Sequence, residues 1–251
     1  MNENACGVIV AAGNGTRLKH LTENCPKPLV LVDGEPMILL PILSMIRAGI
    51  SDIGIVIQPR FRDQFEAFLA HPKIPKGVTL TLIEQDQPKG MAYAVSRAKE
   101  FVQNRVCMVL AGDSVNSFDF SEALQTFEDG ATIFARRENN ADIQKSSGMV
   151  QIDEHGKVLS LVEKPEIPVG NLCQIGGGIY QGDDLMRKIE ALPKTGLKEL
   201  DITQVHNVYL QEENVRCVVM PDGTYYNNVT HPADVDAASE YVRTHPGEFT
   251  L

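Results

Sequence analysis

Strand and helix signals alternate along residues 5–135, and this alternation limits the possible folds more than any other feature of the sequence. Such a βαβ pattern is typical of a mainly parallel sheet that helices cover on both faces. Apolar runs predict the strands, and apolar residues at helical spacing predict the helices. We expect strands over 7–12, 53–57, 78–83 and 106–111, with helices over 37–48, 61–70 and 91–102 between them.

The pattern changes after residue 137. Two runs of alternating polarity, 148–152 and 158–162, flank a turn-rich centre, which predicts an antiparallel β-hairpin. We then expect helices over 183–192 and 201–210, a strand near 215–220 and a closing helix over 232–243. The fold class that follows is α/β: a single-domain three-layer sandwich with a Rossmann-like, mainly parallel mixed sheet and an antiparallel insertion. Ligands of such sheets bind beyond the carboxyl ends of the strands.

Composition excludes several classes of protein. The 251 residues include 33 acidic and 23 basic side chains, a net charge of -10, which argues against nucleic acid as a partner because phosphate backbones bind basic faces. The five cysteines show no CxxC spacing, so we expect neither a zinc knuckle nor a disulfide framework, and we expect a cytoplasmic protein. No apolar run is long enough for a membrane span. Any anionic substrate would need local positive charge.

A glycine-rich loop follows the first predicted strand and holds Gly13, Asn14 and Gly15. Glycines at a strand end let backbone N–H groups approach an anion, and Arg17 and Lys27 add the local cations that a polyphosphate requires. The loop is not a Walker A motif. It also lacks the third glycine of a dinucleotide fingerprint, which weakens a dehydrogenase interpretation. The alternative is a glycine turn with two solvated cations.

The ordered motifs of the chain resemble those of the sugar-1-phosphate nucleotidyltransferases. The segment Ala11-Ala12-Gly13-Asn14-Gly15-Thr16-Arg17-Leu18 with Lys27-Pro28 is similar to the AAGxGTRL and KPL signatures of that family. The later matches are Gln85 with Gly90, Ala111-Gly112-Asp113, Gly148-Met149-Val150 and Glu163-Lys164-Pro165. Several motifs in one order are more specific than one motif alone. The glucose-1-phosphate thymidylyl and uridylyl branch is the nearest likeness.

The resemblance implies an enzyme that joins a nucleoside triphosphate, dTTP or UTP, to a sugar 1-phosphate and releases pyrophosphate, with Mg²⁺ as cofactor. It implies the nucleotide-diphospho-sugar transferase fold, with a nucleotide-binding half over 5–135, a sugar-phosphate-binding half over 136–230 and a closing helix and tail over 231–251. The implied catalytic residues are Arg17, Lys27, Asp113 and Lys164. The implied nucleotide-binding residues are Ala11, Ala12, Gly13, Gly15, Thr16, Gln85, Gly90 and Met91. Those implied for the sugar phosphate are Gly112, Gly148, Glu163 and Lys164, and the implied metal ligands are Asp113 and Asn227.

The sequence departs from the family pattern at several positions. Asn227 stands where relatives carry a metal-binding aspartate, and a neutral amide binds Mg²⁺ more weakly than a carboxylate. An asparagine could instead cap the closing helix, although Thr230 suits that position better. Ser147 replaces a tyrosine, and the stretch 174–178 is unusually rich in glycine. His20 replaces a proline, and we interpret it as a loop variant without a catalytic role.

Two alternatives remain open at this point. The altered positions near 147 and 176–178 are compatible with a cytidylyl- or guanylyltransferase for a non-hexose phosphate such as phosphocholine, an inositol phosphate or a heptose phosphate. A nucleotide-sugar sensor without catalysis would explain a weakened metal site. The expected partners are a nucleoside triphosphate and a sugar 1-phosphate, with no nucleic acid and no membrane, and a homo-oligomer is compatible with the sequence.

Overall fold

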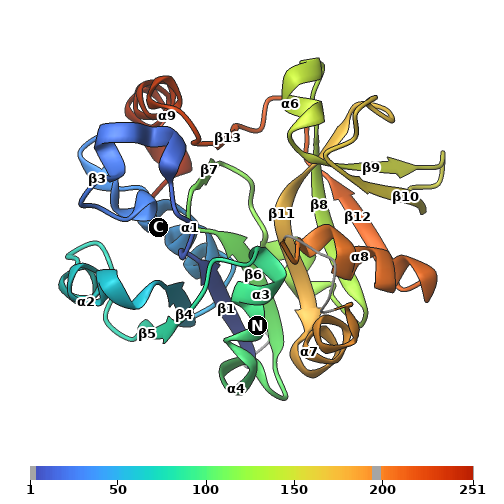
Figure 1. Ribbon diagram of the computed structural model, residues 1–251, viewed down its shortest axis with the longest axis horizontal. Coiled ribbons are helices and arrows are strands. Elements are labelled where there is room, and N and C mark those ends of the chain that lie inside the picture. The colour runs from blue at the N-terminus through green and yellow to red at the C-terminus, as the bar shows by residue number, and fades with distance from the viewer. Residues whose placement is uncertain (1–3, 194–198, 251) are drawn as a thin grey trace.

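A nine-stranded mixed sheet runs through the molecule (Figure 1), and the computed structural model describes residues 4–193 and 199–250. Its path is β10-β9-β11-β6-β1-β4-β5, with β8 joined to β11 and β12 joined to β8. The strands are β1 (Ala5–Val10), β4 (Asp52–Ile57), β5 (Thr79–Glu84), β6 (Val106–Ala111), β8 (Ala131–Arg137), β9 (Gly148–Ile152), β10 (Val158–Glu163), β11 (Leu172–Gln181) and β12 (Val215–Val219). Two small sheets pair β2 (Leu31–Val32) with β3 (Glu35–Pro36) and β7 (Ser114–Asn116) with β13 (Tyr226–Asn228).

The predicted parallel block is present. Strands β5, β4, β1 and β6 all run in the same direction, with Gly7 of β1 opposite Ile53 of β4 and Met108 of β6. Strand β11 is antiparallel to β6, and the β9–β10 hairpin extends this part of the sheet. In Figure 1 the hairpin lies at the opposite end of the molecule from β5 and α2 (Arg62–Leu69). The mainly parallel sheet and its antiparallel insertion are therefore confirmed.

Helices cover both faces of the sheet. One apolar core packs α1 (Leu39–Arg47), α2 and α5 (Ser121–Gln125) against side chains such as Ile9, while the other packs α3 (Met91–Ser96), α4 (Lys99–Val102), α7 (Gly182–Ala191) and α8 (Ile202–Gln211) against side chains such as Val8. Because successive side chains of a strand point to opposite faces, β1 contributes to both cores. The three-layer prediction is confirmed. The remaining helices are α6 (Ala141–Lys145) and α9 (Pro232–Thr244), with short 3₁₀ turns at η1 (Thr16–Thr22), η2 (Lys27–Leu29), η3 (Pro59–Phe61) and η4 (Pro246–Glu248).

The boundaries differ from the predictions in a few places. The helix predicted over 91–102 is divided into α3 and α4, because Arg97 and Ala98 donate to carbonyls only three residues back. Strand β1 ends at Val10, two residues early, as the chain turns into the glycine loop. Gly49 does follow α1 with φ of 93°, as its predicted role at the helix end requires. Across the described residues, no helix has the length and apolar character needed to cross a membrane.

Strand β11 is the principal element that the sequence patterns did not predict. Glycines 176–178 lower the strand propensity of this segment, yet it forms a strand that pairs with β6, β8 and β9. Two extra residues accumulate between Gln174 and Gly178 relative to β8, which is a bulge that bends the strand. Gly177 has φ of 98°, and a Cβ there would lie 2.1 Å from the Val109 carbonyl oxygen. The glycines therefore permit close strand contact beside the cavity described next.

Candidate active site

A cavity of about 1120 Å³ opens at the carboxyl ends of β1 and β6, and both parts of the sheet line it. Of the predicted site residues, all but Ala11 and Gly112 line this cavity. These two lie behind its wall, where Ala11 N–H donates to Val56 and Gly112 N–H donates to Val10. Residues from positions 12 to 234 thus meet around one space, which is the arrangement expected at the strand ends of an α/β sheet.

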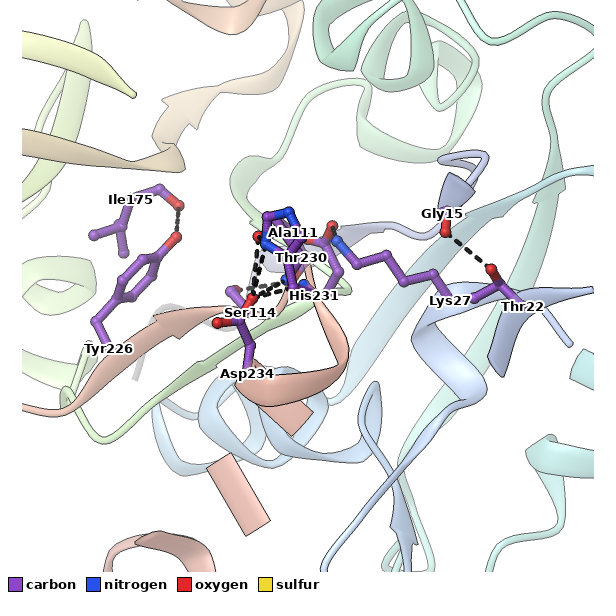
Figure 2. Close-up of polar contacts among 11 residues, drawn as sticks. Gly15, Thr22, Lys27, Ala111, Ser114, Ile175, Tyr226, Thr230, His231 and Asp234 are labelled. Carbon is purple, nitrogen blue, oxygen red and sulfur yellow. Dashed lines mark hydrogen bonds and ion pairs between the residues drawn. The ribbon is translucent and has the colours of Figure 1, made fainter. Parts of the chain in front are cut away.

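The glycine loop is held in place by side chains from outside it. Gly15 has φ of 62°, and a Cβ there would lie 2.9 Å from Cβ of Lys27, so the loop packs directly on the η2 turn. The Thr22 hydroxyl donates to the Gly15 carbonyl over 2.9 Å (Figure 2). Gln58 Nε2 donates to the Ala12 carbonyl over 2.8 Å. Arg17 is exposed and lines the cavity, where it can reach an anion bound to this loop.

The most direct contact among the predicted catalytic residues is an ion pair. Lys27 Nζ lies 2.6 Å from Asp113 Oδ2, and only 7% of the lysine surface is exposed. Asp113 is the second residue after β6, and its backbone carbonyl accepts the Val229 N–H. A buried cation and a carboxylate are therefore fixed on the wall of the cavity.

Strand β13 brings Asn227 to the same region. It pairs with β7, placing Asn227 opposite Val115 and Asn228 opposite Ser114, the residue directly after Asp113. The Asn227 amide nitrogen donates to Tyr225 Oη and to the Asp234 carbonyl, which leaves its Oδ1 without a donor within the described ranges 4–193 and 199–250.

The structure tests whether this donor set suits a metal. The described part of the chain holds no group of three or more histidine, cysteine and acidic side chains that could enclose an ion. Asp113 offers a carboxylate and Asn227 an amide oxygen, both hard oxygen donors on the cavity wall. Mg²⁺ commonly takes one or two protein ligands and completes its shell with water and substrate phosphates. The residues present fit an ion of that kind and do not fit a closed all-protein site.

The closing helix has a different cap from the one predicted. His231 is the residue before α9, and Asp234 accepts backbone N–H groups from both His231 and Thr230 (Figure 2). Thr230 lies one residue too early to cap the helix, so that prediction was wrong. Burial opposes ionisation of Asp234, but the backbone hydrogen bonds from His231 and Thr230 still hold its pKa below the ordinary value. This network sets the turn between β13 and α9.

Gln85 and Gly90 form another wall. Gln85 is 3% exposed, its Nε2 donates to the Gln87 carbonyl over 2.6 Å, and its enclosed Oε1 accepts no bond from any described residue. Gly90 has φ of 97°, and a Cβ there would lie 2.5 Å from the Leu200 carbonyl oxygen. Ala92 N–H donates to that same carbonyl. Close backbone contact therefore requires glycine at the start of α3, as expected from its position before Met91.

Glu163 and Lys164 lie at the end of β10. Their side chains form an ion pair of 2.9 Å, and Lys164 has a positive φ of 44°, an uncommon conformation for a residue other than glycine. The Lys164 N–H donates to the Ser147 carbonyl. Burial opposes the charge of Lys164, but the nearby carboxylate of Glu163 raises its pKa. The lysine therefore stays protonated at the cavity edge.

Several cavity residues were missed by the motif search, among them Gln174, Asp201, Thr203 and Tyr226. Tyr226 Oη donates to the Ile175 carbonyl over 2.9 Å and so joins β13 to β11 (Figure 2). The Thr203 hydroxyl donates to Glu163 Oε2 over 2.5 Å. Burial, with nearby Glu163, raises the pKa of Asp201. No motif marks these residues, because β11, α8 with its N-cap Asp201, and β13 meet only in the folded chain.

Comparison with known proteins fits this geometry. The family profile described as "Nucleotidyl transferase" matches residues 6–244. The chain belongs to the nucleotidyl transferase family. The resemblance to sugar-1-phosphate nucleotidyltransferases drawn from the motifs is thereby confirmed, and the protein is an enzyme of the nucleotidyltransferase class.

Individual relatives agree with the family match. The chain is 32% identical over 245 residues to a glucose-1-phosphate thymidylyltransferase of Mycobacterium tuberculosis, covering 95% of this chain and 82% of the relative. It is 30% identical to one of Xanthomonas campestris, covering 93% of this chain and 79% of the relative. It is also 30% identical to the bifunctional protein GlmU of Methanocaldococcus jannaschii, covering 94% of this chain and 53% of that protein.

A solved structure from Bacillus anthracis supports the fold. It is described as a "Putative Glucose-1-Phosphate Thymidylyltransferase" and superposes with a TM-score of 0.86 at 24% identity, covering 95% of each chain. At this identity the likeness concerns the architecture alone. It confirms the predicted nucleotide-diphospho-sugar transferase fold.

Proposed function

We propose that this enzyme transfers a nucleotidyl group from dTTP or UTP to a sugar 1-phosphate and releases pyrophosphate in an Mg²⁺-dependent reaction. The observation that carries the proposal is the Lys27–Asp113 pair in a cavity that also holds Arg17 and Lys164. Although the chain has a net charge of -10, four Lys and Arg side chains of the described residues line one space that can hold two phosphate-bearing substrates: Arg17, Lys27, Arg136 and Lys164. Relatives named as thymidylyltransferases add support for the donor and acceptor classes.

The reaction requires no general base. A phosphate oxygen of the sugar 1-phosphate attacks the α-phosphorus in line, a new phosphoanhydride bond forms, the bond to the β-phosphate oxygen breaks, and pyrophosphate departs with the bonding electrons. The attacking monoester is already anionic near neutral pH, so catalysis consists of positioning and charge neutralisation.

Three of these side chains have a part in this proposal. Arg17 holds the β- and γ-phosphates that leave, with backbone groups of the loop from Ala12 to Thr16 beside them. Lys27 stabilises charge on the α-phosphate, and Lys164 holds the attacking phosphate. Asp113 and Asn227 would hold Mg²⁺, which when bound neutralises charge that develops on the phosphate oxygens.

The enclosed Oε1 of Gln85 supports a pyrimidine base. Thymine and uracil carry an imide N–H flanked by two carbonyl oxygens, so they donate once and accept twice on this edge. The Gln85 carboxamide and the backbone of Gly90, which carries no side chain, offer the complementary groups. Cytosine lacks the imide hydrogen, and a site that leaves Gln85 Oε1 unpaired would bind it less well.

A panel of substrate pairs tests the proposal. Pyrophosphate release is measured for dTTP, UTP, CTP, GTP and ATP against glucose 1-phosphate, N-acetylglucosamine 1-phosphate, phosphocholine, an inositol phosphate and a heptose phosphate. We expect turnover with dTTP or UTP and a sugar 1-phosphate, and its loss when a chelator removes Mg²⁺. Turnover only with CTP or GTP and a non-hexose phosphate would replace this function, and tight product binding without turnover on any pair would indicate a sensor.

A further inference from the structure

Three buried polar side chains form a continuous path from the interior to the cavity. Tyr180 Oη lies 2.6 Å from His206 Nε2, and His206 Nδ1 lies 2.7 Å from Gln174 Oε1. Tyr180 and His206 are 0% exposed, and Gln174 is 9% exposed. Tyr180 and Gln174 lie on β11, and His206 lies on α8. None of the three belongs to a motif that marked the site.

Protonation fixes the direction of these hydrogen bonds. Burial lowers the pKa of His206 to about 3, so the imidazole is neutral and carries one N–H. Burial raises the pKa of Tyr180 far above its ordinary value, so the phenol keeps its proton. Because an amide oxygen only accepts, His206 carries its hydrogen on Nδ1, and its Nε2 accepts the tyrosine hydroxyl proton. With Gln174 Oε1 bonded to His206, Gln174 Nε2 is turned away from the imidazole.

Nε2 of Gln174 borders a spot where three polar groups meet. A Cβ on Gly148 would lie 3.0 Å from this nitrogen, 3.0 Å from Glu163 Oε2 and 2.9 Å from Thr203 Oγ1. An amide N–H that faces a carboxylate is favourable, whereas the flipped amide would set its oxygen toward Glu163. All four residues line the main cavity, yet no described group accepts a hydrogen bond from Nε2. A buried donor without a partner is costly unless something else supplies the acceptor.

We propose that Gln174 is a specificity-determining residue that donates from Nε2 to a hydroxyl oxygen of the acceptor substrate, with His206 as the positioning residue. This inference rests on the proposed function and adds a rule for the acceptor. The group at this spot must offer a lone pair, so a hydroxyl is accepted, and a deoxy carbon or an ammonium group is disfavoured.

Access to the donor involves Thr203. Nε2 is enclosed in this conformation, so an incoming oxygen must displace a neighbour. The Thr203 hydroxyl donates to Glu163 Oε2, and rotation about a single bond turns it away. The substrate hydroxyl then accepts from Gln174 and can donate to the carboxylate that Thr203 has released. One hydroxyl thus replaces another, and the carboxylate keeps a donor.

The test measures discrimination between matched acceptors. Pyrophosphate release is measured at saturating dTTP for glucose 1-phosphate and its 2-, 3-, 4- and 6-deoxy forms, for the unaltered chain and for Gln174→Leu. In the unaltered chain we expect one deoxy form to fall about tenfold in kcat/KM, the size of one lost hydrogen bond. In Gln174→Leu we expect glucose 1-phosphate to fall to the level of that deoxy form, while the KM for dTTP is unchanged.

Further variants separate recognition from folding. Gln144→Leu is the matched control, because Gln144 is equally buried but bonds the Glu138 and Gly170 carbonyls and does not line the main cavity. It should lose stability and keep the discrimination. Gln174→Glu retains the size and the acceptor for His206 but presents no donor, so it should lose discrimination like Gln174→Leu. His206→Leu should reduce the ratio of kcat/KM for glucose 1-phosphate to kcat/KM for the deoxy form. Combining it with Gln174→Leu should reduce this ratio no further.

The outcomes are distinct. Turnover by the unaltered chain with the same acceptor ratios in Gln174→Leu and Gln174→Glu overturns the inference and leaves the proposed function standing. Loss of dTTP binding by calorimetry in both variants also overturns it, since a residue that reads only the acceptor leaves nucleotide affinity intact. Absence of pyrophosphate release from every acceptor in the unaltered chain removes the proposed function, and this inference with it.

Discussion

Lys27 Nζ lies 2.6 Å from Asp113 Oδ2, so two residues separated by 86 positions neutralise each other inside the cavity. The pair holds the lysine at the cavity wall before substrate binds. When a phosphate binds Lys27, Asp113 becomes available to a cation. When a cation binds Asp113, Lys27 becomes available to a phosphate. The pair therefore couples the two kinds of charge that the proposed reaction requires.

Asp113→Asn should lower kcat by about 10²- to 10³-fold, since it removes a charge that would bind Mg²⁺ and leaves Lys27 without its carboxylate partner. Steady-state pyrophosphate release measures the effect, and circular dichroism checks the fold. Asp222→Asn is the control, because Asp222 forms an exposed ion pair with Arg137 outside the main cavity. Equal loss in both variants, or full activity of Asp113→Asn, would remove Asp113 from the site.

Asn227→Asp should lower the Mg²⁺ concentration needed for half-maximal activity by about tenfold, because a carboxylate replaces a neutral amide oxygen beside Asp113. A titration of activity against Mg²⁺ measures the change. Asn228→Asp adds the same charge to the adjacent position of β13, opposite Ser114, and should change the half-maximal concentration less. Identical curves for both variants would mean that Asn227 is not a ligand.

Gly90→Ala should lose more stability than Gly77→Ala. Both glycines have nearly the same conformation, with φ of 97° and 98°, so alanine incurs similar backbone strain of about 1 kcal/mol at each position. A Cβ at Gly77 meets open space, whereas one at Gly90 collides with the Leu200 backbone. Urea unfolding compares the two variants, and dTTP affinity should fall only for Gly90→Ala. Equal losses of stability would show that the Leu200 backbone can shift to accommodate the Cβ at little cost.

Acid should destabilise the fold through His206. Its folded pKa of about 3 lies below the ordinary 6.5, so the unfolded chain binds a proton that the folded chain excludes. The stability that neutral His206 provides is therefore complete above pH 6.5 and is lost as the pH falls toward 3. Between pH 7.5 and pH 5 the expected loss is about 2 kcal/mol. Near neutral pH, His206→Leu should unfold more easily, because Tyr180 and Gln174 lose a hydrogen-bond partner. Its stability should lack this part of the pH slope, and an unchanged slope would contradict the assignment.

Local patterns predicted most of the parallel core. The strand at 106–111 and the strand at 148–152 have the predicted bounds, because each is a short run bounded by turn residues, which favours a strand over a helix. The glycine loop was recognisable because Gly15 has a positive φ of 62°, a conformation that favours glycine; anion binding by the loop stays a prediction. Such features depend on a few neighbouring residues, and a sequence displays them directly.

Long-range features could not be predicted in this way. Strand β11 could not be predicted from residue propensities, because glycine does not favour strands. Gly177 instead lets β6 approach closely. The cap of α9 depends on the Asp234 carboxylate, which folds back onto Thr230 and His231. The contact of Gln174 with His206 joins positions separated by 32 residues and depends on how α8 packs on the sheet. Each is a property of tertiary packing.

The pairing of β13 with β7 has a consequence for biosynthesis. Asn227 and Asn228 can pair with β7 only after β13 has been made, although β6 itself is complete by Ala111. During translation at about 5–20 residues per second, the ribosome needs several further seconds to reach β13. The nascent chain can pair its four parallel strands in that interval, but the part of the cavity wall that β7 and β13 build together forms only after β13 has been made.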